Sequence, residues 1–74
     1  MTGKNEPRTV RMHHPTGRVK DVTYRDEREM VEYVTLSLTD NGYERRRNIA
    51  ASAARALLDG PIYVGGAAYE VVEV

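Results

Sequence analysis

The chain has 74 residues, its 11 Lys and Arg residues are balanced by 11 Asp and Glu residues, and it contains no Cys. A chain this short supports one domain, because it buries only about 60 to 65% of the surface that its unfolded form exposes. The absence of Cys excludes disulfides and thiolate metal ligands, and the balanced charge removes the overall positive field of a dedicated nucleic-acid binder. We expect a cytoplasmic protein, because no apolar run is long enough to span a bilayer and the N-terminus lacks the apolar core of a secretory signal.

The N-terminal third of the sequence predicts a polar lead-in followed by a β-hairpin. Residues 1–7 (MTGKNEP) are polar and end in Pro, so we expect them to be disordered and a single α+β domain to occupy residues 8–74. Alternating side chains over 8–13 and a segment rich in Val, Thr and Tyr over 18–24 predict two strands. Pro15 and Gly17 supply the turn between the strands.

Residues 26–39 allow two interpretations, of which the first is a strand over 31–39. Val34, Leu36 and Leu38 alternate with residues that also favour strands. The dipeptide Asn41-Gly42 that follows is a strong hairpin-turn signal. The weak point of this interpretation is the return strand, because residues 43–47 (YERRR) contain no aliphatic side chain.

The alternative is a helix over 26–39. Asp26 and Glu29 have the spacing of a capping box. Apolar side chains then recur on one helical face, at Met30, Val31, Val34 and Leu38. With a second helix over 43–58 and hairpins on both sides, the outline would resemble a winged helix-turn-helix.

The last third of the sequence predicts a helix and a second hairpin. Residues 48–59 are rich in Ala, with Asn48 as the N-terminal cap and Gly60-Pro61 as the stop. The apolar stripe of this helix contains Ile49, Ala50, Ala53, Ala54, Leu57 and Leu58. Strands over 62–64 and 69–74 then flank a Gly65-Gly66 turn. The predicted fold is therefore an antiparallel sheet of hairpins packed against one Ala-rich helix.

Arg and Tyr are the residue types that we expect to carry function. Arg45, Arg46 and Arg47 form a concentrated positive site that can grip phosphates or carboxylates, and it is placed against the unfavourable positive end of a helix dipole. Tyr and Arg together are typical of binding hot spots. If the Asn41-Gly42 hairpin forms, Tyr33 and Tyr43 come close to each other. We therefore expect these five residues to bind the partner.

No catalytic or metal site is expected. His13 and His14 are adjacent, so on a strand they point to opposite faces and cannot readily chelate one ion. No Ser or Thr has the spacing of a nucleophile paired with either His. We also expect no cofactor, no membrane contact and no small-molecule substrate.

These features favour a small, non-catalytic protein-binding or regulatory module that acts through a Tyr/Arg surface or a sheet edge, for example the strand over 69–74. The preference for Arg over Lys, with much Ala, Val and Gly, is typical of a phage or mobile element of a high-GC host. The expected partner is a host or viral protein, or a second copy in a homodimer. The alternatives are a local nucleic-acid-binding protein that uses Arg45–Arg47 and a structural component of a larger assembly.

Overall fold

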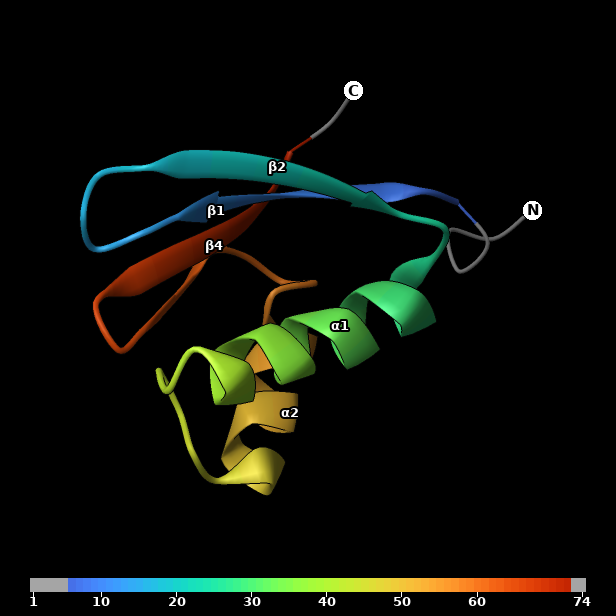
Figure 1. Cartoon of the computed structure of the whole chain (residues 1–74). Helices are drawn as coiled ribbons and strands as arrows, with labels where there is room; N and C mark the ends of the chain where they lie inside the picture. Colours follow the sequence, from blue (N-terminus) through green and yellow to red (C-terminus); the bar gives the residue numbers. More distant parts are fainter. Residues whose placement is uncertain (1–5, 73–74) are drawn as a thin grey trace.

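The computed structural model describes residues 6–72, so the lead-in expected over residues 1–7 lies almost wholly outside the described residues. The elements in chain order are β1 (Arg8–His13), β2 (Val19–Tyr24), α1 (Glu27–Asp40), α2 (Arg47–Ala56), β3 (Ile62–Val64) and β4 (Ala67–Val72). The structure confirms a small α+β domain, with one antiparallel sheet of hairpins and helices packed against it (Figure 1).

The sheet has the strand order β2-β1-β4-β3, so the first and last strands of the chain form its centre. β4 pairs with β1 over Ala68–Val72 and with β3 over Ala67–Tyr69. β4 lies inside the strand order and β2 and β3 are the outer strands, but of the edge strand predicted over 69–74, which the structure describes as far as Val72, only Tyr69 pairs with β3. Both hairpins form where the turn residues predicted them.

Both helices lie on the same face of the sheet (Figure 1). α1 packs on β1 and β2, and α2 packs mainly on α1. In the two central strands, alternate residues such as Val10 and Met12 of β1 and Tyr69 of β4 face the helices and are buried, whereas no residue of β2 is buried. The helices contribute Met30, Val34, Leu38, Ala50, Ala54 and Leu57 to the same core.

The strand predicted over 31–39 is wrong, and the helical alternative is confirmed as α1. Asp26 caps the helix, because its Oδ1 accepts a hydrogen bond from the backbone N–H of Glu29 at 2.8 Å. The helical spacing places Met30, Val34 and Leu38 on one face, where all three are fully buried. β-branched Thr35 is accommodated because its hydroxyl donates to the carbonyl of Val31 at 2.6 Å.

Asn41 and Gly42 end α1 instead of turning a hairpin. The N–H of Gly42 donates to the carbonyl of Thr39 at 3.1 Å, and the N–H of Tyr43 donates to the carbonyl of Leu38 at 3.0 Å. These two bonds define a Schellman motif, in which the residue after the cap has a positive φ. Gly42 has φ +74°. The same preference of Asn-Gly for left-handed backbone that suits a hairpin turn thus terminates a helix here.

The predicted Ala-rich helix exists as α2, with shifted ends. It begins at Arg47, its N-cap is Arg46, and no side chain caps it, so Asn48 is a residue of the first turn and not the cap. Ala50 and Ala54 are fully buried, and small side chains at these positions let α2 approach α1 closely. Ile49 and Leu58, expected on the core stripe, are exposed.

The turn between β3 and β4 packs tightly on the segment that joins the helices. An added Cβ at Gly65, which has φ +60°, would lie 2.7 Å from the Cα of Tyr43. Only glycine fits both this backbone conformation and this approach. The contact fixes the C-terminal hairpin against the helix connection.

Candidate protein-binding groove

A surface groove of about 740 Å³ runs between α1 and α2. Its wall on the α1 side consists of Asp26, Glu27, Arg28, Val31, Glu32 and Thr35. α2 contributes Arg47, Ala51 and Arg55, and Leu58 follows at the end of that helix. We call this surface the α1–α2 groove.

The α2 wall of the groove follows directly from helical spacing. Arg47, Ala51 and Arg55 are four residues apart, so they form one stripe along the helix. The methyl group of Ala51 leaves room between the two long arginine side chains. Leu58 extends the stripe and is 43% exposed. The wall is therefore apolar along its middle and cationic at its rim.

The carboxylates at the N-terminal end of the groove are bound within the chain. Asp26 caps α1, and Glu27 accepts a hydrogen bond from Arg8 at 3.0 Å. By contrast, Arg28, Glu32, Arg47 and Arg55 make no side-chain hydrogen bond or ion pair with any part of the chain between residues 6 and 72. Three positive charges and one negative charge at the rim are thus available to a partner.

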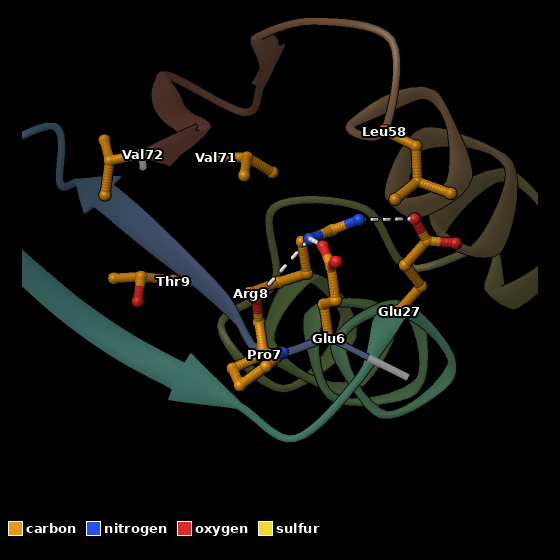
Figure 2. Close-up of a pocket in the computed structure, with 8 residues that line it drawn as sticks. All are labelled: Glu6, Pro7, Arg8, Thr9, Glu27, Leu58, Val71 and Val72. Atoms are coloured by element: carbon orange, nitrogen blue, oxygen red, sulfur yellow. Dashed lines mark hydrogen bonds and ion pairs between the residues drawn. The ribbon is translucent and has the colours of Figure 1, made fainter. Parts of the chain in front are cut away.

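A second hollow adjoins the groove and shares Glu27 and Leu58 with it. Figure 2 shows the Arg8 side chain extended toward Glu27, with Leu58 on one side of the hollow and Val71 and Val72 on another. The hydrogen bond to Glu27 raises the pKa of the Arg8 guanidinium above its ordinary value. This ion pair forms the boundary between the two hollows and ties β1 to the start of α1.

Only one of the three adjacent arginines predicted to bind a partner lines the groove. Arg47 does so, whereas Arg45 is exposed in the helix connection. Arg46 donates two hydrogen bonds to the carboxylate of Glu44, at 3.1 and 3.3 Å, and these bonds lower the pKa of Glu44. All three arginines are therefore exposed, but Arg46 is also paired with Glu44 within the chain.

The two tyrosines predicted to form an interface pair lie in different environments. Tyr33 is half-exposed on α1 and stacks on Tyr24 of β2, with ring centroids 5.9 Å apart and an interplanar angle of 11°. Tyr43 is partly buried against the core, and its hydroxyl lies 3.3 Å from Nδ1 of His14. The hairpin that was expected to bring Tyr33 and Tyr43 together does not form, because α1 continues to Asp40.

The face of the sheet opposite the helices is polar, and its charges are paired. Arg11 donates to both carboxylate oxygens of Asp21, at 3.0 and 3.1 Å, which lowers the pKa of Asp21. Nε2 of His13 lies 2.9 Å from Oε2 of Glu70. Tyr63 on β3 is 80% exposed and is the largest apolar group at the rim of this face.

The described residues contain no metal-binding cluster. Between residues 6 and 72 there is no group of three or more His, Asp and Glu side chains that could hold a metal ion. His13 and His14 are separated as expected, since the first contacts Glu70 on the sheet and the second contacts Tyr43.

The sequence analysis missed most of the groove. Leu58 was assigned to a core stripe but is exposed, Val31 was assigned to the core and does pack partly against it, and neither Arg28 nor Arg55 was given a binding role. One signal was present in the sequence: Arg47, Ala51 and Arg55 are spaced four residues apart. It could be used only after the packing of α1 against α2 was known.

The fold and groove define the class of this molecule as a small ββααββ domain with a two-helix layer on one face of its sheet. The chain matches no protein-family model, no curated protein and no solved structure. Neither helix of the described part of the chain has the length and apolar character needed to cross a membrane.

Proposed function

We propose that this chain is a small, non-catalytic protein-binding module that holds a segment of a partner protein in the α1–α2 groove. The observation that carries the proposal is an apolar groove floor, formed by Val31, Ala51 and Leu58, beneath arginines that have no partner among residues 6–72. Exposed apolar surface rimmed by polar groups is typical of interaction sites. Arg is among the residue types enriched in such interfaces.

The groove is a better candidate than the open face of the sheet. On the open face, Arg11 and His13 are already occupied by Asp21 and Glu70. A partner would have to compete with these contacts, which offsets part of what it gains. In the groove, the arginine side chains lose hydration and conformational freedom when a partner binds, but they break no hydrogen bond or ion pair with residues 6–72.

The test is a selection from a random displayed peptide library, followed by binding measurements on two variants of α2. Ala51→Arg fills the middle of the groove with a long side chain. Ala56→Arg places the same side chain on an exposed position of α2 that does not line the groove. Far-UV circular dichroism checks whether both variants keep the fold of the parent.

The expected result is that enriched peptides bind the parent and Ala56→Arg alike, and bind Ala51→Arg at least about tenfold more weakly. Peptides that bind Ala51→Arg as tightly as the parent would contradict the groove as the binding site. A selection that enriches no peptide would contradict the proposal as a whole.

A second candidate function is nucleic-acid binding through Arg45, Arg46 and Arg47. It is favoured by the helix pair, which gives the outline of a helix-turn-helix followed by the β3–β4 hairpin. The first turn of α2 also contains no acidic residue that would repel phosphate. The overall charge of zero counts against it.

Fluorescence anisotropy with labelled duplex and single-stranded oligonucleotides over a salt series tests this candidate. Binding that weakens steeply with salt and is lost when all three arginines are changed to Ala would establish phosphate contacts. Absence of binding at low salt, with the protein folded, would eliminate the candidate.

A further inference from the structure

We infer that the segment held in the α1–α2 groove is an acidic amphipathic helix of a partner protein. This inference rests on the proposed function and adds the conformation and the charge of the bound segment. Three features of the groove carry it: the secondary structure of its walls, the spacing of its arginines and the balance of its charges.

The walls of the groove favour a helix over an extended strand. A peptide that binds as an added strand needs free backbone N–H and carbonyl groups along the site. Val31, Ala51 and Arg55 lie within α1 and α2, so their backbone groups belong to helical hydrogen-bond ladders. Along Val31, Ala51 and Arg55 the groove therefore offers a partner side-chain contacts and no strand edge, and side chains recurring on one face of a helix are the usual way to fill such a groove.

The spacing of the arginines matches a helix of the same pitch. Arg47 and Arg55 are eight residues apart on α2, which corresponds to about 12 Å along the helix axis. Ala51, whose side chain is a single methyl group, lies midway between them. A partner helix that lies along α2, with carboxylates seven or eight residues apart and an apolar residue between them, would meet both arginines and fill the space above Ala51.

The charge balance selects an acidic partner. Of the six charged residues in the lining, Asp26 is a helix cap and Glu27 is paired with Arg8. The other four are Arg28, Arg47, Arg55 and Glu32, of which three are positive. Complementary charge across an interface selects partners and speeds their encounter, and a basic helix would meet three positive charges against one negative charge at this rim.

The probes are two labelled synthetic peptides of about five helical turns, with Leu at the same positions on one face. One peptide carries Glu at the flanking positions and the other carries Lys. Anisotropy is measured with the parent, with Arg47→Glu/Arg55→Glu, and with Arg18→Glu/Lys20→Glu. The last variant changes the net charge by the same amount at two exposed positions that do not line the groove.

The expected result is that the Glu peptide binds the parent at least about tenfold more tightly than the Lys peptide, and that this preference falls as salt rises. Arg47→Glu/Arg55→Glu should abolish or reverse the preference, while Arg18→Glu/Lys20→Glu should retain it. Equal binding of the two peptides, equal effects of the two double variants, or no binding of either peptide would overturn the inference.

The failure of this inference and the failure of the proposed function are distinguishable. If selected peptides are sensitive to Ala51→Arg but are basic or uncharged, the groove binds a partner segment and only its acidic character is wrong. If no peptide of either set is sensitive to Ala51→Arg, the groove is not the binding site.

Discussion

Replacing Gly65 with Ala is expected to destabilise the domain more than the same replacement at Gly17. Both glycines have a positive φ, +60° at Gly65 and +95° at Gly17. A Cβ at Gly17 would meet nothing within 4 Å, whereas a Cβ at Gly65 would lie 2.7 Å from the Cα of Tyr43 and 2.9 Å from its carbonyl oxygen. Both variants therefore place a Cβ on left-handed backbone, but only Gly65→Ala also makes that Cβ clash with Tyr43.

The magnitude follows from these two contributions. A left-handed conformation costs a residue with a Cβ about 1 to 2 kcal/mol. Overpacking at a contact that cannot relax adds about 1 to 3 kcal/mol. Tyr43 is poorly placed to retreat, because its N–H is bonded to the carbonyl of Leu38 at 3.0 Å. We expect a loss of about 2 to 5 kcal/mol for Gly65→Ala and about 1 to 2 kcal/mol for Gly17→Ala.

Urea unfolding followed by circular dichroism measures both changes in the free energy of unfolding. Thermal unfolding provides a second measurement, since 1 kcal/mol corresponds to about 4 to 8 °C in Tm for a domain of this size. Equal losses in the two variants would refute the close packing of the C-terminal hairpin on the helix connection.

Two further predictions concern the core and the open face of the sheet. Ser37→Ala should lower the free energy of unfolding in urea by about 1 to 2 kcal/mol, because it removes the hydrogen-bond partner, 2.8 Å away, of the buried Tyr69 hydroxyl. Ser52→Ala, on the exposed face of α2, is the control and should change the free energy of unfolding very little. Equal effects of the two variants would argue against the buried bond. Because Arg11 holds the pKa of Asp21 below its usual range, the pair stabilises the fold above about pH 4 and this contribution is lost as the pH falls through the lowered pKa. Arg11→Gln should therefore make the free energy of unfolding less dependent on pH in that range. If this free energy falls as steeply with acid in Arg11→Gln as in the parent, the pairing is contradicted.

The parts of the fold that the sequence predicts are those determined by neighbouring residues. The turn at Pro15 and Gly17 and the turn at Gly65-Gly66 are encoded by backbone preferences of a few residues, so both hairpins follow from local chemistry. The Ala and Leu residues of the segment 49–58 likewise recur only at helical spacing, which predicts α2.

Local sequence could not decide whether the residues of α1 form a helix or a strand, because their apolar pattern fits both periods. Val34, Leu36 and Leu38 repeat every second residue, while Met30, Val34 and Leu38 repeat every fourth. In the structure Leu38 is fully buried whereas Leu36 is only partly buried, so the helical period describes the core. The choice between the two periods is made by the packing of α1 on the sheet and on α2, which the residues of α1 alone do not specify.

The groove was unpredictable for a related reason. Whether Val31 and Leu58 are core residues or surface residues depends on the angle at which α2 packs against α1, and no local pattern specifies that angle. The pairing of Arg46 with Glu44 was within reach of sequence reasoning, since the two residues are two positions apart.

The central pairing of β1 with β4 has a consequence for the order in which the fold is completed. Thr9 and Val72 are register partners, so contacts that span almost the whole chain must close before either central strand has both of its neighbours. Such pairings carry a large loop-closure entropy and slow folding. During synthesis, one edge of β1 therefore has no partner strand until β4 has left the ribosome.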